Sequence, residues 1–516
     1  MIYTDYLYIF FVLLLTLVYF VLPLSKRWIA LLATSICFYC TWGVKLLPFA
    51  AAATAVAWGA GLIITRRFER MDAEIKSREW SDRKEKAAFQ LKVKQANRWI
   101  LWTAVAILLG MLIYTKVGVF LVSDRTKILI PLGISYYTMS LISYLADVYW
   151  RKETAENNFF KLFLFAIFFP KILEGPISRH RLVAKQLNEG HTYDYDRMCK
   201  GFQRILWGYF KKLVIADRLS MFVTPVFTNY TYHHGSILLV AAIFGALQLY
   251  CDFSGAMDMA LGTAEIFGIS LEENFNHPFF SKSAAEFWRR WHITLGTWFK
   301  DYIYMPLIVS PGLMQFSGKV RKRFGKRAGK NVLTIGPLLL VWLLTGLWHG
   351  TGANYVAWGV YWGLLIILST VLEPELKQLN TLLHIDADSN GFNLFRMVRT
   401  FCLFVISRII SIPSSLHATM GIFNRILLHF GAWELVDGTL YKQGLSRQNF
   451  VLVLLCIFVL YLVSRQQEKG VNIREWIAVK PLPLRWTIYI ISIMIVLIFG
   501  IYGAGYNASS FVYMKY

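Results

Sequence analysis

Long apolar runs, separated by short polar segments, recur along this chain from residue 5 to residue 513. A helix that crosses the hydrocarbon core of a bilayer needs about 20 predominantly apolar residues, and the longer runs reach that length. The runs are Tyr6–Leu24, Trp28–Trp42, Leu46–Thr65, Trp99–Val122, Ile128–Trp150, Phe159–Leu173, Phe202–Phe227, Ser236–Tyr250, Val332–Trp348, Tyr355–Leu372, Phe395–Ile412, Phe450–Val463 and Trp486–Tyr502. Some are too short for a straight crossing, so we expect roughly 11 membrane-spanning helices together with re-entrant or interfacial ones. The pattern predicts an all-α polytopic membrane protein.

The basic residues between the runs predict how the chain is oriented in the membrane. Lys26 and Arg27 follow the first run, and residues 66–98 carry 11 Lys/Arg against 6 Asp/Glu. Residues 316–330 contain a second basic cluster, VRKRFGKRAGK, and residues 465–485 form a third. Because cytoplasmic loops carry the excess of Lys and Arg, we expect these segments in the cytoplasm and both termini outside it.

Composition agrees with this class and narrows the possible partners. Of the 516 residues, 56% are hydrophobic, and the formal net charge is +23. That charge suggests nucleic-acid binding, but the basic residues lie in short loops, where positive-inside bias and attraction to anionic lipid explain them. There is no Gly-rich phosphate loop and no Cys/His set with zinc spacing, so we predict no nucleic-acid partner, metal or bound cofactor. We expect one integral-membrane domain over residues 1–516, surrounded by membrane lipid, with the six cysteines as packing residues.

His349 is the first candidate for chemistry. It lies in the sequence TGLWHGTG, between the apolar runs Val332–Trp348 and Tyr355–Leu372. An ionisable side chain flanked by membrane-spanning sequence is costly and by default marks a functional site. Histidine also transfers protons near neutral pH, and the neighbouring glycines allow close backbone approach or leave space for a substrate. The alternative is a buried histidine that only bridges helices through hydrogen bonds.

Specific polar residues interrupt the hydropathy pattern in the middle of the chain. Asp252 and Ser254 follow the run Ser236–Tyr250, where an acid and a hydroxyl end an apolar span. The segment NFNHPFF then predicts a turn, in which Pro278 stops any helix.

A capping box at Ser283 and Glu286 predicts the start of a helix that continues to Phe299. Its aromatic residues recur at helical spacing and mark one apolar face, which Arg289, Arg290 and Lys300 flank. This pattern predicts an amphipathic helix at or just inside the cytoplasmic interface. His292 lies beside the apolar face, and on this local pattern alone we favour a role in interfacial anchoring.

Taken in order, these motifs resemble the membrane-bound O-acyltransferase family. The order is YCDFSG, then NFNHPFFSKSAAEFWRRWHITLGTWFKDYIYMPL, then TGLWHGTGANYVAWGVYWG, preceded by PLGISYY and FPKILEGPI. Within the family they are similar to the bacterial branch of alginate O-acetyltransferase subunits and D-alanyl-lipoteichoic-acid transfer proteins. The resemblance is tight over residues 131–363, and the closing FVYMKY (Phe511–Tyr516) is similar to the aromatic end of alginate-type members. A chance match to three ordered motifs is implausible, whereas GLWHG alone would be a weak signal.

The resemblance implies a ring of tilted transmembrane helices around a thin centre, crossed by a tunnel that joins a cytoplasmic to an extracytoplasmic mouth. It also implies that the family's catalytic histidine is His349, and that its second motif histidine, an asparagine in many eukaryotic members, is His292. Acyl transfer to a hydroxyl needs a base for the hydroxyl proton and a group that steadies the oxyanion. We expect His349 to be the base and His292 to orient the donor, either acetyl-CoA or an acyl-carrier thioester.

Other residues of the same motifs are candidates for lining this tunnel, namely Asp252, Ser254, Trp348, Trp291, Glu286, Arg289 and Asn354. For the acids the alternative is structural, because buried carboxylates are normally paired, here with Arg289, Arg290 or Lys300. We favour that structural role for Glu286 and for the nearby acids Asp258, Glu265 and Asp301. Asp252 is the exception, because it ends an apolar span beside Ser254.

Of the features of the function, the acyl group and the acceptor are those that the sequence determines least. Chain length and the aromatic end are closer to the alginate type, which favours acetyl transfer toward an exported cell-surface polysaccharide, in a bacterial plasma membrane. A separate extracytoplasmic acetyltransferase is then the expected partner. D-alanyl transfer to teichoic acid is the alternative within the family. Two alternatives lie outside the family: a polytopic transporter and a catalytically silent scaffold. Inverted repeats would support the transporter, and we find none in the sequence.

Overall fold

The computed structural model describes residues 1–121, 131–502 and 511, without the side chains of residues 117–121. Across these residues the backbone forms helices, turns and loops, and the one β-bridge, between Phe275 and Trp291, is isolated. The all-α prediction is therefore confirmed. The start of the expected run Ile128–Trp150 and all but Phe511 of the closing FVYMKY motif lie outside the described residues.

The chain divides into two compact units, which we describe separately. The first comprises Met1–Phe202 and Ala260–Glu272, and the second comprises Gln203–Met259 and Glu273–Tyr516. The long helices α9 (Tyr195–Tyr209) and α11 (Gly235–Ile266) each contribute residues to both. Our expectation of one domain over residues 1–516 stays a prediction.

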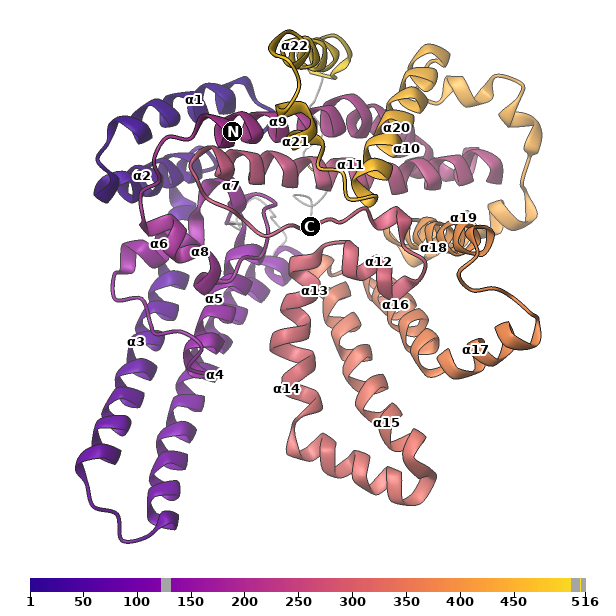
Figure 1. Ribbon diagram of the computed structural model, residues 1–516. Coiled ribbons are helices and arrows are strands. Elements are labelled where there is room, and N and C mark those ends of the chain that lie inside the picture. The colour runs from indigo at the N-terminus through magenta and orange to yellow at the C-terminus, as the bar shows by residue number, and fades with distance from the viewer. Residues whose placement is uncertain (122–130, 503–510, 512–516) are drawn as a thin grey trace. The chain divides into compact units, whose positions relative to one another are not determined.

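The first unit is built from α1 to α8 (Figure 1). These helices and the short 3-10 turns between them are α1 (Tyr6–Val21), η1 (Leu24–Lys26), α2 (Arg27–Cys40), η2 (Val44–Leu46), α3 (Leu47–Ser77), α4 (Arg83–Leu121), α5 (Ile134–Tyr149), α6 (Phe159–Ile167), α7 (Phe169–Ile172) and α8 (His180–Asn188). Phe165, Phe168 and Phe169 are fully buried at its centre. The long pair α3 and α4 runs side by side and extends beyond the other helices of the unit (Figure 1).

The second unit holds the remaining helices and the three family-like motifs, YCDFSG within Gln203–Met259 and the other two after residue 273. They are η4 (Phe210–Ala216, a π-helix), α10 (Asp217–Thr228), η5 (Tyr230–Tyr232), η6 (Pro278–Phe280), α12 (Ala284–Arg290), α13 (Ile293–Phe299), η7 (Lys300–Tyr304), α14 (Met305–Ile308), α15 (Pro311–His349), α16 (Ala353–Val371), α17 (Glu373–Leu382), α18 (Asn390–Ser411), α19 (Leu416–Leu428), η8 (Ala432–Leu435), η9 (Thr439–Lys442), α20 (Arg447–Glu468), α21 (Ile473–Ala478) and α22 (Leu482–Phe499). Gly325 has φ +88°, outside the helical region, and divides α15 into two legs.

Seven helices among the described residues are long and apolar enough to cross a membrane. They span Val44–Ser77, Arg83–Lys116, Gly235–Ile266, Pro311–His349, Ala353–Val371, Arg447–Glu468 and Leu482–Phe499, and the apolar helix Tyr6–Val21 is shorter. Their outer faces carry exposed Leu, Ile, Val and Phe side chains, as lipid-facing helices do. The chain is thus a multi-pass membrane protein, while the total of roughly 11 crossings stays a prediction.

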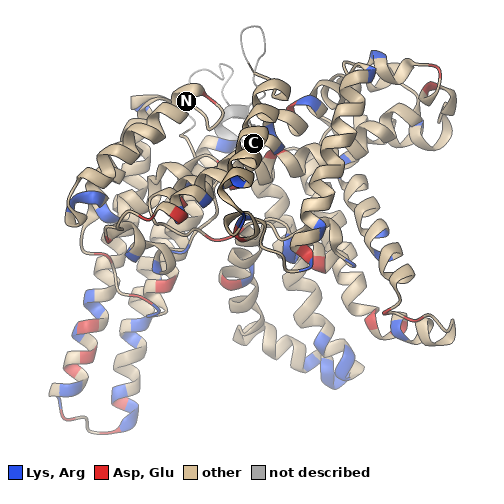
Figure 2. Ribbon diagram, turned by 45° about the horizontal axis from the view of Figure 1, so that its top comes forward, with Lys and Arg blue, Asp and Glu red and all other residues tan. Residues whose placement is uncertain are grey.

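The basic clusters lie at the ends of long helical hairpins. Figure 2 shows the charged residues of segment 66–98 gathered at the far end of the α3–α4 pair, where Lys and Arg alternate with Asp and Glu. The second cluster surrounds the bend of α15 at Gly325, where the same view shows Lys and Arg alone. Both places are highly charged, as loops at a membrane face should be.

Two expectations about local structure are wrong. Asp252 does not end a span, because α11 continues through it to Ile266. The expected amphipathic helix from Ser283 to Phe299 is broken into α12 and α13, since His292 has φ +47° in the left-handed region. Its aromatic face is also buried in the second unit rather than lying on its surface, as the near-zero exposure of Phe287 and Trp291 shows.

Glycines bring α15 and α16 into close contact. A Cβ atom at Gly359 would lie 2.5 Å from the carbonyl oxygen of Trp342, and one at Gly346 would lie 2.5 Å from that of Tyr355. Small residues at facing positions allow this approach of two backbones, as is common between membrane helices. The contact fixes the last turn of α15, which ends at His349.

Candidate functional site

The two motif histidines lie together in the second unit, although 57 residues separate them in sequence. The ring centres of His292 and His349 are 6.3 Å apart, with 60° between the ring planes. Both side chains are buried, with exposed fractions of 1% and 6%. The structure therefore brings together the pair that the sequence motifs single out.

His349 is the last residue of α15 and is held by aromatic rings. Its imidazole contacts the indole of Trp348 at 4.8 Å and that of Trp358 on α16 at 5.2 Å, both edge to face. Gly350 follows with an extended backbone and ends the helix. The glycine contact between α15 and α16 sets the distance between His349 and Trp358, so the packing of the two helices positions the imidazole.

His292 sits at the break between α12 and α13. The backbone here pairs with the preceding turn, because Asn276 N–H donates to the Arg290 carbonyl at 2.9 Å and Ile293 N–H donates to the Asn274 carbonyl at 3.1 Å. This short pairing stops α12 and turns the His292 ring toward Phe253 on α11, at 4.8 Å, and toward Trp348, at 5.8 Å. A continuous helix would not place the ring in this way.

Asn274 determines the tautomer of His292. The Asn274 Oδ1 atom accepts from Thr294 N–H at 3.0 Å and from the Thr294 hydroxyl at 2.9 Å, so it is the amide oxygen. His292 Nδ1 lies 3.3 Å from the same oxygen and must carry the proton in this contact. Burial lowers the pKa of the His292 imidazole to about 3, which keeps the ring neutral. Nε2 therefore keeps its lone pair and can accept a hydrogen bond.

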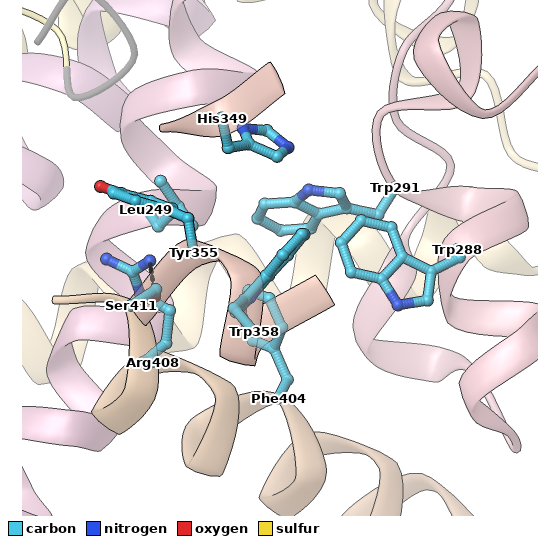
Figure 3. A pocket seen from close by; sticks show the side chains of 9 residues that line it. All are labelled: Leu249, Trp288, Trp291, His349, Tyr355, Trp358, Phe404, Arg408 and Ser411. Carbon is cyan, nitrogen blue, oxygen red and sulfur yellow. Dashed lines mark hydrogen bonds between the residues drawn. The ribbon is translucent and has the colours of Figure 1, made fainter. Parts of the chain in front are cut away.

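A small cavity opens beside His349. Its volume is about 30 Å³, enough for one or two water molecules or a group of similar size. The side chains that line it are Leu249, Trp288, Trp291, His349, Tyr355, Trp358, Phe404, Arg408 and Ser411. Figure 3 shows His349 on one side of the cavity and Arg408 with Ser411 on the other, with Tyr355 and Trp358 between them. The site thus combines a histidine, a cation and hydroxyl groups in an aromatic enclosure.

The other residues predicted for the site divide into near and distant ones. Trp291 lines the cavity, and Trp348 contacts both histidines. Asn354 at the start of α16 donates through Nδ2 to the Pro413 carbonyl at 2.9 Å and so connects the end of α18 to this region. Arg289 is exposed and does not line the cavity.

Glu286 has the structural role that we favoured for it. Its carboxylate lies 2.9 Å from the Arg290 guanidinium, and Glu468 of α20 contacts the same guanidinium at 2.7 Å. Glu286 also accepts from the Lys282 backbone N–H, while its own N–H donates to Ser283 Oγ, which confirms the predicted helix cap. The group lies at the start of α12 and does not line the cavity.

Asp252 and Ser254 belong to a buried ionic network, not to the cavity. Lys212 Nζ lies 2.6 Å from Asp252 and 2.9 Å from Asp217, and Lys211 Nζ lies 2.9 Å from Ser254 Oγ. Asp258 pairs with Lys211 at 2.6 Å and with Arg204 at 2.9 Å. Both lysines come from the π-helix η4, whose wider turn presents consecutive residues to α11. Asp252 and Asp258 thus pair with these residues rather than with Arg289, Arg290 or Lys300, whereas the expected pairing with Arg290 is confirmed for Glu286.

Three residues of the site were missed in the sequence. Arg408 lies within the run Phe395–Ile412, and the rule that singled out His349 applies equally to an arginine in such a run. Asn274 was part of a quoted motif, but only the fold shows that its side chain reaches His292. Tyr355 follows the last motif glycines by a few residues and carries no signal of its own.

Comparisons with known proteins identify the family of the chain. The model of MBOAT, the membrane-bound O-acyltransferase family, matches residues 85–318. The chain is 31% identical over 424 residues to the probable alginate O-acetylase AlgI of Pseudomonas syringae pv. tomato, covering 80% of this chain and 72% of that protein. It is 29% identical over 382 residues to the peptidoglycan O-acetyltransferase of Helicobacter pylori, covering 66% and 63%. It is 30% identical over 251 residues to the teichoic acid D-alanyltransferase of Bacillus subtilis, covering 48% and 60%. The resemblance inferred from the motifs is confirmed, and the chain belongs to the membrane-bound O-acyltransferase family.

Proposed function

We propose that this membrane O-acyltransferase moves an acetyl group from a cytoplasmic thioester, acetyl-CoA or an acyl-carrier thioester, across the membrane toward hydroxyl groups of an exported cell-surface polysaccharide. The observation that carries the proposal is the pair of buried histidine rings, 6.3 Å apart beside a small cavity. A transporter or a silent scaffold has no need of two ionisable rings in an apolar enclosure, where each costs free energy.

The proposed reaction uses His349 as general base. His349 takes the proton of the acceptor hydroxyl while the oxygen attacks the thioester carbonyl carbon. The tetrahedral oxyanion then collapses, the C–S bond breaks, and the thiolate leaves with the proton returned by the imidazolium. His292, fixed by Asn274 with Nε2 unprotonated, is placed to orient the donor or to accept a hydrogen bond from the acceptor.

Acetyl transfer is favoured over D-alanyl transfer by the charge of the cavity. The described residues that line it include Arg408 and no carboxylate. A D-alanyl group carries an ammonium, which would meet a guanidinium of like charge in a low-dielectric enclosure, and this is unfavourable. An acetyl group is neutral and meets no such repulsion. D-alanyl transfer, as named for the Bacillus subtilis relative, is therefore the second candidate.

The membrane, the orientation and the partner are part of the proposal. We place the protein in a bacterial plasma membrane, with the basic clusters of 66–98 and 316–330 in the cytoplasm and both termini outside, because of the positive-inside rule. The acetyl group then starts from a cytoplasmic donor and reaches the outer face. A separate extracytoplasmic acetyltransferase completes the transfer to the polysaccharide.

Substitution of the two histidines tests the proposal. His349→Asn should leave essentially no transfer, because asparagine has no titrating group and a positioned base contributes about 10²–10⁴-fold. His292→Asn should keep measurable transfer, because another hydrogen-bonding side chain can orient a donor. Acetyl incorporation is measured in reconstituted membranes, with protein amount determined in parallel and with exposed His417→Ala as the control.

Two outcomes would contradict the assignment. Transfer at the wild-type rate in a normally expressed His349→Asn protein would refute the role of His349 as general base. Equal residual activity in the two asparagine variants would mean that the roles are not divided in this way, even though both rings border the same space.

A further inference from the structure

A buried arginine faces His349 across the cavity. Arg408 lies one turn before the end of α18, and its exposed fraction is 7%. Its Nη1 donates to Ser411 Oγ at 2.8 Å, whereas Nε has no hydrogen-bond partner in the described part of the chain. Within the same residues no carboxylate lies within salt-bridge distance of its guanidinium. Arg408 is thus a cation at the wall of the site to which the described part of the chain offers no counter-ion.

Two other buried cations of this unit have carboxylate partners. Lys212 lies between Asp217 and Asp252, and Lys211 pairs with Asp258. Burying a charge without a partner costs several kcal/mol, and such groups in membrane proteins normally find one. The cavity that Arg408 lines is the space from which a partner other than the described residues can reach it.

The position of the guanidinium fits a ligand that also reaches His349. In Figure 3 the guanidinium lies beside Ser411 and below the Tyr355 ring, while the His349 imidazole is on the opposite side of the cavity. The aromatic rings of Trp358 and Trp291 fill the remaining wall. Because both side chains line the same cavity, a substrate group that enters it beside His349 also comes near Arg408.

We propose that Arg408 binds an oxoanion of a substrate, a carboxylate or a phosphate, and thereby sets which substrate binds beside His349. This rests on the proposed function and adds a substrate class to it. A guanidinium forms two parallel hydrogen bonds with such an oxoanion, and Ser411 fixes its orientation. The oxoanion has two possible sources: a carboxylate of an acidic sugar in the acceptor, or a phosphate of the thioester donor.

A structural role for Arg408 makes a different prediction. A cation in the last turn of a helix interacts favourably with the helix dipole, and this can stabilise α18 without any ligand. In that case neutralising Arg408 lowers stability and affects charged and neutral substrates alike. Discrimination between charged and neutral substrates is thus the readout that separates the two roles.

The experiment compares Arg408→Met and Arg408→Lys with Arg396→Met in the full-length protein in proteoliposomes. Arg396 is on the same helix, donates to the Lys282 carbonyl and does not line the cavity, so it is the matched control. The acceptor probes are oligomers of D-mannuronate and neutral oligomers of D-mannose of equal length. The donor probes are acetyl-CoA and S-acetylpantetheine, which lacks phosphate. KM and kcat are measured for each pair.

For the charged member of one pair, Arg408→Met should raise KM by about 10- to 100-fold, the contribution of a charge-assisted hydrogen bond. KM for the neutral member should not change, and Arg408→Lys should lose part of the discrimination. An effect confined to mannuronate identifies the acceptor as the source, and an effect confined to acetyl-CoA identifies the donor. Equal losses on charged and neutral probes, or no loss on either, overturn the proposal.

Binding measurements keep this test separate from the proposed function. Equilibrium dialysis with tritiated oligomannuronate and with CoA measures the contribution of Arg408 to binding affinity, even if no acetyl group is transferred. Absence of transfer in the wild type would refute the acetyltransferase proposal alone. Identical binding of both probes to the wild type and to Arg408→Met would refute the oxoanion site alone.

Discussion

Gly359→Ala should reduce activity through the position of His349, although residue 359 touches neither substrate nor histidine. The new Cβ atom would lie 2.5 Å from the Trp342 carbonyl oxygen and 3.4 Å from the Gly346 Cα. An ordinary contact begins at 3.4 Å, so α15 and α16 must separate by about 0.9 Å at this level. His349 is two turns further along α15, and a misplacement of about 1 Å can lower a rate by about 10²-fold.

The assay is acetyl incorporation in membranes that contain equal amounts of folded protein, with KM and kcat determined separately. We expect kcat to fall by about 10²-fold, because the base moves relative to the acceptor. Gly336→Ala is the control, because it lies on α15, the other helix of this contact, with no atom within 4 Å of its Cβ position. A wild-type kcat for Gly359→Ala at normal expression would refute the claim that the glycine contact positions His349.

Three further predictions concern other parts of the chain. Lys212→Met removes the cation that two buried carboxylates share, so the free energy of unfolding should fall by about 3–5 kcal/mol, measured as a lower thermal midpoint in detergent. Exposed Lys185→Met should leave the midpoint unchanged. Asn274→Leu deprives His292 Nδ1 of its acceptor and should lower kcat by about 10- to 100-fold, with most activity kept in Asn274→Asp; similar losses in both would show that only packing matters. In a variant without the six native cysteines, single cysteines at Ser81 and Ala328 should react with an impermeant thiol reagent only after cell lysis, and labelling of either on intact cells would reverse the proposed orientation.

The sequence predicted the elements that depend on local periodicity. Long apolar runs became long helices, and the rule that a membrane-embedded ionisable residue is functional found His349. The helix cap at Ser283 and Glu286 was also predictable, because a capping box involves only four consecutive residues.

What the sequence did not predict depends on contacts between distant segments. The break at His292 arises from backbone pairing with residues 274–276, and nothing in the local helical pattern signals it. The partners of Asp252 and Asp258 come from η4, about 40 residues earlier, where a π-helix turns both lysines inward. Arg408 could have been singled out by its charge, but only the fold places it opposite His349.

The backbone at His292 restricts which residues can replace it. A left-handed φ of +47° is unfavourable for most side chains and excludes β-branched ones, whereas asparagine and glycine adopt it readily. Asparagine also retains a group that can hydrogen-bond to Asn274. The two requirements together, conformational and chemical, are met by very few residue types, which gives a physical reason for the alternation of histidine and asparagine that the family resemblance implies here. The backbone conformation at position 292 should therefore restrict the residue types found there more strongly than the chemistry of the reaction does.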